Sequence, residues 1–418
     1  MRGTDGAGGA SGATGYRYGG AQTVVALAKA GGSNVKTTSR LTVLAIGMAV
    51  AALTAIAALA GSTTPAHSAP VVPQGFTHSQ VASGLVDPTD MEFSPDGRLF
   101  VTEDKGRVRI VNPNNGTLTT FLDISAIVNA RLSRGLHAIT FDPAFATNHY
   151  VYLHFTRKAT GTTPSHERVE RWTASTTSNT TVAGSEKLIF RIGTKSADQY
   201  MGGALDFGPD GKLYVAVGDH DTPANAQKLS NLFGKLVRIG ADGTIPTDNP
   251  FYTQTTGRNR AIWALGLRNP FKFAIQPGTG TIHINDVQDG GPEEIDLGVK
   301  GANYGWPLYQ GMENDPKYTD PIFTYQHKGD VATTGCAITG GTFYNPPTVD
   351  FPAQYEGDYF FADYCNGWIR VRDSNGTVSG FATGLGDKGV IDLEVSKSGE
   401  LYYLNRSTTG IVSKIGFG

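Results

Sequence analysis

The chain has few cysteines and few charged residues. Among its 418 residues there are only two cysteines, and Asp, Glu, Lys and Arg together make up 17%. The formal net charge of −2 argues against nucleic acid or an anionic membrane surface as a partner, because both favour basic proteins. A strong amphipathic helical repeat and an exposed heptad pattern are also missing, so we expect neither a helix-rich fold nor helix-mediated association, and we predict a monomer.

The first 69 residues are predicted to precede the folded domain. Residues 1–39 are rich in Gly, Ala, Ser and Thr, which predicts a disordered N-terminal extension. Residues 40–69 have the plan of a secretory signal: a basic start, an apolar run from Leu41 to Ala60 and an exit of small residues. The apolar run is long enough to span a bilayer, so this segment predicts either a cleaved signal peptide or an uncleaved signal anchor. Both interpretations place the domain outside the cell, attached to a membrane only in the second case.

The two cysteines, Cys336 and Cys365, predict one disulfide. An isolated pair in an exported protein is usually oxidised, whereas this spacing fits no zinc pattern and no histidine cluster accompanies it. The bridge would tie the stretch before Phe343 to a strand at residues 359–364.

Glycine and proline are abundant, with 54 and 21 residues, and a short phrase recurs along the chain. It consists of an apolar residue, a turn of the Pro-Asp-Gly type and an aromatic-rich strand. Pro fixes φ at the start of the turn, Gly supplies a positive φ at its end, and β-branched and aromatic residues favour the strand. Six copies occur, beginning at Phe93, Phe141, Phe207, Ile275, Phe351 and Val395.

Recurrence of such a unit is typical of a β-propeller. We therefore predict an all-β, six-bladed β-propeller over residues 70–418, as one domain because no Pro/Ser linker interrupts it. Alternation at residues 107–111 and 236–239 predicts strands. A terminal strand near residues 411–415 is expected to close the ring by pairing with an N-terminal strand. Two long excursions, residues 219–230 and 286–310, are expected to build the functional site, because loops carry function on such scaffolds.

A set of ordered motifs carries a more specific signal. They are Arg134-Gly135-Leu136, Phe141-Asp142-Pro143 with Phe145, Gly234-Lys235-Leu236-Val237-Arg238-Ile239, Asp242-Gly243, Asp248-Asn249-Pro250-Phe251, Ile262-Trp263-Ala264-Leu265-Gly266-Leu267-Arg268-Asn269-Pro270 and Gly301-Ala302-Asn303-Tyr304-Gly305-Trp306-Pro307. Each motif is weak alone, but the ordered set resembles the soluble glucose/sorbosone dehydrogenases, also called PQQ-dependent aldose sugar dehydrogenases. The resemblance covers about residues 75–416. It implies a six-bladed propeller that binds pyrroloquinoline quinone (PQQ), with a calcium ion that orients and polarises the quinone.

The resemblance also assigns residues to the cofactor and the metal. Arg268 and Asn269 match the pair that contacts the quinone, and a guanidinium there suits a carboxylate or a reduced, anionic quinone. Residues 286–296 match the calcium loop, where the backbone carbonyls of Gln288 and Asp289 are the expected ligands, together with Glu294. Arg370 and Arg372 match two anion-binding groups; they lie two apart on a predicted strand and would face the same way.

The catalytic base departs from the family pattern. Tyr200 stands where the family has the histidine that takes the proton of the sugar hydroxyl, while Asp219, nineteen positions later, matches the carboxylate that orients this histidine. A tyrosine has a pKa near 10 and is a poor base at neutral pH unless cations such as Arg268 lower it. His220 or His137 could instead supply an imidazole from a neighbouring loop.

Two further positions depart from the family. Ser133 replaces a Gln or Glu that contacts the quinone, and Leu267 replaces the usual His before Arg268. The first hypothesis is thus a secreted PQQ- and calcium-dependent sugar dehydrogenase. The alternatives are a propeller polysaccharide lyase or hydrolase, in which Tyr and His act as base and acid, and a non-catalytic carbohydrate-binding propeller. All three imply a carbohydrate ligand.

Overall fold

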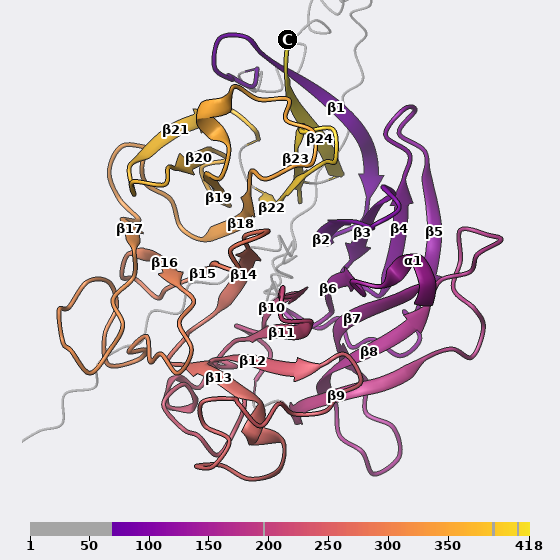
Figure 1. The fold of residues 1–418 in the computed structure, drawn as a ribbon, viewed down its shortest axis with the longest axis vertical. Coiled ribbons are helices and arrows are strands. Elements are labelled where there is room, and N and C mark those ends of the chain that lie inside the picture. Colours follow the sequence, from indigo (N-terminus) through magenta and orange to yellow (C-terminus); the bar gives the residue numbers. More distant parts are fainter. Residues whose placement is uncertain (1–68, 195–196, 387–388, 408) are drawn as a thin grey trace, which may run out of the picture. The chain divides into compact units, whose positions relative to one another are not determined.

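The computed structural model describes residues 69–194, 197–386, 389–407 and 409–418. They form six four-stranded antiparallel sheets, arranged around a central axis as a β-propeller (Figure 1). The first strands of successive blades contact one another around this axis. The predicted extension at 1–39, and all but the last residue of the predicted signal at 40–69, lie outside the described residues.

The blades follow the chain in order. Blade 1 is β2 (Pro88–Phe93), β3 (Leu99–Glu103), β4 (Arg107–Val111) and β5 (Leu118–Asp123). Blade 2 is β6 (Leu136–Phe141), β7 (Tyr150–Arg157), β8 (His166–Thr173) and β9 (Lys187–Thr194). Blade 3 is β10 (Gly202–Phe207), β11 (Lys212–Val217), β12 (Lys235–Gly240) and β13 (Ile262–Leu265).

Blade 4 is β14 (Pro270–Ile275), β15 (Ile282–Asp286), β16 (Glu293–Leu297) and β17 (Phe323–Tyr325). Blade 5 is β18 (Ile338–Phe343), β19 (Tyr359–Asp363), β20 (Ile369–Arg372) and β21 (Val378–Ala382). Blade 6 is β22 (Val390–Val395), β23 (Leu401–Asn405), β24 (Gly410–Phe417) and β1 (Phe76–Leu85). Helices are short in the described part of the chain: α1 (Phe145–Asn148), η1 (Pro223–Asn225), η2 (Gly257–Ala261) and η3 (Ala353–Tyr355).

The six copies of the repeated phrase correspond to the six blades. Each copy is the connection between the first and second strand of one blade, as between β2 and β3, where Gly97 at φ 89° closes the turn by donating its N–H to Ser94 O (2.8 Å). The prediction of an all-β, six-bladed propeller is confirmed. Within the described residues no helix is long and apolar enough to cross a membrane.

Closure of the ring is also confirmed. β1 pairs antiparallel with β24, with register from Phe76 opposite Phe417 to Leu85 opposite Gly410. The predicted long loop at 219–230 lies between β11 and β12, as expected. The bounds of the long loop predicted at 286–310 are wrong. Strand β16 occupies residues 293–297, so the long connection begins after it and runs to Phe323. Glu293 and Ile295 of β16 are fully buried.

The disulfide joins Cys336 and Cys365, whose Cα atoms are 5.6 Å apart, as predicted. The carboxylate of Asp363 holds the two loops that the disulfide joins: it accepts the backbone N–H of Cys336 (2.9 Å) and that of Cys365 (2.8 Å). The bridge thereby connects the loop before β18 to the loop after β19 within blade 5.

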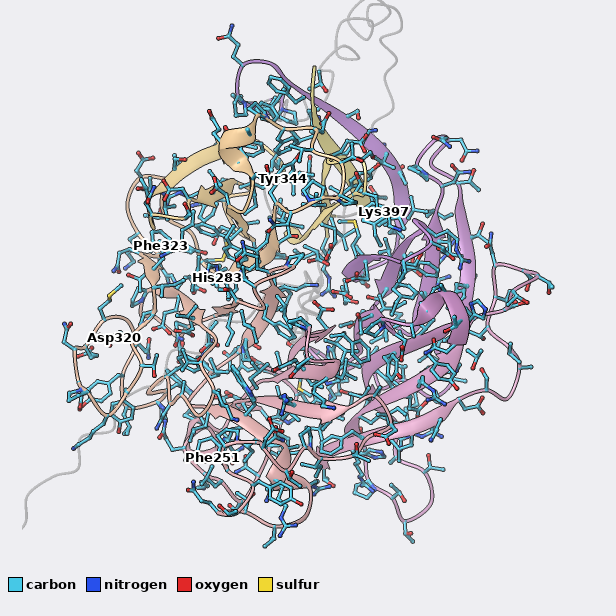
Figure 2. The ribbon with its side chains drawn as sticks, viewed as in Figure 1. Phe251, His283, Asp320, Phe323, Tyr344 and Lys397 are labelled. Atoms are coloured by element: carbon cyan, nitrogen blue, oxygen red, sulfur yellow. A yellow bond between two sulfur atoms is a disulfide. The ribbon has the colours of Figure 1, made fainter. Side chains whose placement is uncertain are left out.

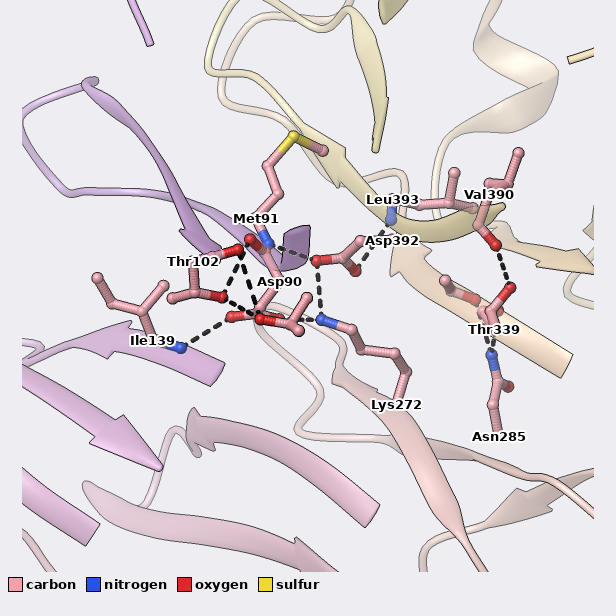
Figure 3. Close-up of polar contacts among 12 residues, drawn as sticks. Asp90, Met91, Thr102, Ile139, Lys272, Asn285, Thr339, Val390, Asp392 and Leu393 are labelled. Carbon is pink, nitrogen blue, oxygen red and sulfur yellow. Dashed lines mark hydrogen bonds and ion pairs between the residues drawn. The ribbon is translucent and has the colours of Figure 1, made fainter. Parts of the chain in front are cut away.

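A buried lysine joins carboxylates from two other blades (Figure 3). Nζ of Lys272, on β14 of blade 4, donates to the carboxylates of Asp90 in blade 1 and Asp392 in blade 6, the latter at 2.7 Å. These carboxylates also accept backbone N–H groups: Ile139 donates to Asp90 (2.8 Å) and Met91 donates to Asp392 (2.7 Å). One buried ammonium group therefore links the inner strands of four blades.

Candidate functional site

The predicted catalytic residues gather at one end of the propeller. The Pro-Asp-Gly turns join first and second strands at the opposite end, so the loops between second and third strands, and between blades, share this end. Tyr200 precedes β10, Asp219 follows β11, and Arg268 precedes β14. The end that carries the site is therefore formed from irregular loops, and the repeated phrase supplies the other end.

Arg268 is the centre of the cluster. Its side chain is buried, and its guanidinium carbon lies 4.0 Å from the ring centroid of Tyr200 and 5.5 Å from that of Trp306. Nη1 donates to the carbonyl oxygens of Val287 (2.7 Å) and Gln288 (2.9 Å). A cation over aromatic rings is attracted by their π-faces. The result is a fixed positive charge at the end of the propeller axis.

Asp219 lies next to this cation. Its backbone N–H donates to Arg268 O (2.8 Å), while Oδ2 accepts the indole N–H of Trp306 (2.8 Å) and Oδ1 accepts the N–H of Asp221 (2.8 Å). Burial raises the pKa of Asp219, and the bond from Trp306 opposes that shift. The carboxylate expected to orient a base therefore orients Trp306 against Arg268.

Tyr200 begins a strained segment. Its φ of 54° lies in the left-handed region that favours glycine, and its carbonyl accepts the N–H of His220 (3.1 Å). Two residues later, the N–H of Gly202 donates to the side-chain oxygen of Asn269 (2.9 Å). Asn269 thus holds the Tyr200 segment, and Tyr200 in turn covers one face of Arg268.

The two histidines proposed as alternative bases have different environments. His220 is fully buried, bonded to Glu167 (2.8 Å) and packed on Phe233 with ring centroids 4.1 Å apart. His137, at the start of β6, is only half-buried. Burial, followed by the nearby charge of His154, lowers the pKa of His137 to about 3, so its imidazole is neutral at physiological pH. At this end of the propeller His137 is partly exposed to solvent, whereas His220 is fully buried.

The predicted metal loop contains a buried acidic cluster. The carboxylates of Asp286, Glu294 and Asp296 offer oxygens that all lie within 4.8 Å of one another. Gln288 joins it, its amide N–H groups donating to Asp286 (3.0 Å) and Glu294 (2.7 Å). Burial, then mutual repulsion, raises the pKa of Glu294 and Asp296 well above the ordinary value, and burial raises that of Asp286 to about 7.

Three oxygens of this cluster have no hydrogen-bond partner: both of Asp296 and the side-chain oxygen of Gln288. Unpaired buried oxygens are costly, and a hard cation such as calcium takes this kind of ligand. Of the predicted ligands, Gln288 and Glu294 belong to the cluster, but by their side chains. The carbonyl of Gln288 accepts from Arg268, and the side chain of Asp289 is 71% exposed.

Four further positions singled out in the sequence contribute no side chain to the cluster around Arg268. Arg370 and Arg372 are on β20, the third strand of blade 5, and Arg370 packs against Trp368 and Phe323 (Figure 2 labels Phe323). They share a strand face as predicted, but the structure does not bring them to Arg268. Ser133 donates its backbone N–H to Asp198 O (3.0 Å), and Leu267 is buried in the apolar core.

Sequence reasoning missed a second repeat. A polar residue ends the second strand of four blades and bonds the loop that precedes the first strand of its own blade: Glu103 accepts from Val86 (2.8 Å), Asp286 from Arg268 (2.9 Å), Asp363 from Cys336 (2.9 Å), and Asn405 donates to Leu385 (2.8 Å). The signal was available, since each of these residues is the last residue of a largely apolar strand. It identifies Asp286 as the acceptor that fixes the backbone of Arg268.

A ring of six four-stranded blades, with a buried arginine and a buried oxygen cluster among its loops, defines the chain as a six-bladed β-propeller. Residues 85–414 match the family described as Glucose / Sorbosone dehydrogenase, and the chain belongs to that family.

Three relatives illustrate the similarity. Quinoprotein glucose dehydrogenase B of Acinetobacter calcoaceticus is 30% identical over 306 residues, which cover 66% of this chain and 63% of that protein. Aldose sugar dehydrogenase YliI of Escherichia coli is 29% identical over 350 residues, covering 79% of this chain and 90% of the relative. The crystal structure of the soluble aldose sugar dehydrogenase from E. coli in the apo-form, 25% identical, superposes with a TM-score of 0.71 over 82% of this chain and 100% of that one.

Proposed function

We propose that the protein is a secreted sugar dehydrogenase that depends on PQQ and calcium and transfers hydride from a sugar hydroxyl to the quinone. Family membership and the quinoprotein among its relatives support this proposal. The observation that carries it is Arg268, a buried cation with aromatic rings on its faces. A planar, anionic quinone needs a positive charge and flat apolar surfaces, and these residues offer both.

When bound, the quinone supplies the hydride acceptor; the chain supplies the rest. Arg268 would stabilise the negative charge that develops during reduction, at no reorganisation cost because Val287 and Gln288 already fix its guanidinium. Trp306 is held by Asp219 and keeps water from one side of that charge. Asn269 would fix the Tyr200 segment rather than the cofactor.

Two side chains remain for removal of the sugar proton. Tyr200 and His137 both keep partial exposure at this end of the propeller, whereas His220 is enclosed. His137 is neutral, so its lone pair can accept a sugar hydroxyl proton, but a pKa of about 3 makes it a weak base unless ligand binding raises that pKa. Comparing Tyr200→Phe with His137→Gln separates them, because removal of the base lowers kcat far more than it changes quinone affinity.

For calcium we propose the cluster of Asp286, Glu294 and Asp296, with the side-chain oxygen of Gln288. The unpartnered oxygens of Asp296 support this ligand set. A divalent cation there would offset the buried negative charge and would stiffen the loop whose carbonyls hold Arg268.

The test is a titration of PQQ, with calcium present, followed by quenching of tryptophan fluorescence and then by dye reduction with a panel of aldoses. We expect Arg268→Ala to weaken PQQ binding at least tenfold. Arg171→Ala is the matched control, since Arg171 also lies over a ring, that of Tyr150 at 3.6 Å, but in β8.

Absence of PQQ binding by the wild type would overturn the proposal. Two further assays would then separate the alternatives: ultraviolet absorbance of an unsaturated uronate product identifies a lyase, and glycan retention without turnover identifies a binding propeller.

A further inference from the structure

A row of buried titratable side chains joins blades 2 and 3 beside the site. His154 of β7, Glu167 of β8 and His220, after β11, are each at most 1% exposed. Glu167 bridges the two imidazoles: Oε1 lies 2.7 Å from Nε2 of His154, and Oε2 lies 2.8 Å from Nε2 of His220. The surroundings are apolar, because Val169 on the same strand packs with Val215 and Val237 of blade 3.

The contacts of His154 fix where protons must be. Its Nδ1 lies 3.1 Å from the carbonyl of Gly203, which can only accept, so Nδ1 carries a proton. Nε2 lies at ion-pair distance from Oε1 of Glu167, although the two atoms are not aligned as a hydrogen bond, and two lone pairs this close would repel unless one atom carried a proton. Either His154 is doubly protonated beside an ionised Glu167, or Glu167 is protonated beside a neutral ring.

The surrounding groups shift the pKa of Glu167 and of His137. Burial would raise the pKa of Glu167, but His154 and His220 outweigh burial and hold it below the usual range. Burial and then His154 lower the pKa of His137 of β6, while Glu167 opposes this shift and His220 and Arg406 add to it. His154 is therefore enclosed between the carboxylate of Glu167 and the carbonyl of Gly203.

Both ends of this row hold the segment that covers Arg268. His220 donates its backbone N–H to the carbonyl of Tyr200 (3.1 Å), and His154 donates to the carbonyl of Gly203 (3.1 Å). A Cβ at Gly203 would lie 3.2 Å from Cβ of His137, so this segment is also packed against His137. Displacement of either end would move Tyr200 relative to Arg268.

A buried ion pair between two blades carries a large desolvation cost. Replacing a buried pair by apolar residues of similar volume is often neutral or stabilising, so packing alone gives no reason for these three side chains. A bonded carboxylate does, however, fix direction and distance in a way that apolar packing does not.

We propose that His154 and Glu167 are positioning residues, which hold the segment Tyr200–Gly203, left-handed at Tyr200, and so set the distance between Tyr200 and Arg268. The proposal rests on the proposed function only in that Arg268 is taken to bind the quinone. Glu167 lies on β8, the third strand of blade 2, and would thereby affect the affinity for the cofactor.

The first test observes the proton directly. In protein labelled with ¹⁵N on histidine, one imidazole should carry a proton on Nδ1, because the carbonyl of Gly203 can only accept, and Glu167→Gln should shift the Nε2 resonance of this ring. Absence of an Nδ1-protonated ring in the wild type would overturn the contact on which the proposal rests. This readout is independent of PQQ, so it remains decisive if the proposed function fails.

The second test separates positioning from stability. Glu167→Gln should weaken PQQ binding about tenfold, with partial rescue in Glu167→Asp. The matched control is Glu170→Gln, which removes another buried carboxylate from β8, one paired with Arg168 on the opposite face. If Glu167→Gln and Glu170→Gln lower the melting temperature alike and both leave PQQ affinity unchanged while Arg268→Ala abolishes it, the positioning role is refuted. If Glu167→Gln does not fold, the double variant Glu167→Leu with His154→Leu takes its place. This variant should restore packing but not the affinity for PQQ.

Discussion

Removing the ammonium group of Lys272 should destabilise the propeller strongly. In Lys272→Met two buried carboxylates, those of Asp90 and Asp392, lose their common cation, while Asp90 keeps one backbone donor and Asp392 keeps two. Breaking a buried ion pair by removing one partner costs about 3–5 kcal/mol. Since a domain has only about 5–15 kcal/mol of stability in total, this single substitution should consume much of it.

The loss should depend on pH in a defined direction. Burial already raises the pKa of Asp392 to about 7, and loss of the lysine raises it further. A carboxyl whose folded pKa is raised stabilises below its unfolded pKa, near 4, and loses that contribution as pH rises through the folded value. The penalty of Lys272→Met should therefore be larger at pH 7.5 than at pH 5.

Urea unfolding followed by tryptophan fluorescence measures both values. Lys414→Met is the control, because Lys414 pairs with Glu400 at the surface, one-third exposed, and such a pair contributes about 1 kcal/mol or less. Should Lys272→Met not fold, the triple variant that adds Asp90→Asn and Asp392→Asn removes the unpaired charges and should recover a folded protein. A loss under 1 kcal/mol at pH 7.5, or an equal loss at both pH values, would refute the reasoning.

Three further predictions follow from other parts of the molecule. Calcium added to chelated protein should raise the melting temperature, by an amount equivalent to about 2.7 kcal/mol at one hundred times Kd, and Asp296→Asn should abolish the rise; a rise that survives this change places the ion elsewhere. Replacing Cys336 and Cys365 by serine should cost about 2–4 kcal/mol in urea unfolding, and an unchanged midpoint would contradict this. Burial raises the pKa of Asp206 to about 6, so stability should fall from pH 5 to 7.5, and less steeply in Asp206→Asn; parallel curves would count against it.

The sequence predicted the fold well because the fold repeats. A turn that needs Pro and Gly, followed by an aromatic strand, is a local rule, and six copies of a local rule reveal six blades. The disulfide was equally accessible, since two cysteines allow a single pairing. Arg268 and Asp219 were placed in the correct loops because each lies at the end of a recognisable strand.

The site could not be predicted at the same level, because its contacts are long-range. Trp306 reaches Asp219 from a connection 87 residues later, and no local pattern announces that bond. Arg370 and Arg372 share a face, as their spacing indicated, but the sequence does not say that their strand is the third of its blade. The bridge through Glu167 was invisible for the same reason: its three side chains come from separate strands and loops.

The pairing of β1 with β24 has a consequence for how the protein folds. The last blade takes three strands from the end of the chain and one from its start, with Phe76 opposite Phe417. Blades 1 to 5 are each contiguous in sequence and can form as the chain lengthens. Blade 6 can form only when its strand β24 is present. Contacts between such distant residues are slow to form, so ring closure should be the late step. Until the two ends meet, the edges of the unclosed ring would lack pairing partners, and edges of this kind are where strands of other chains can add.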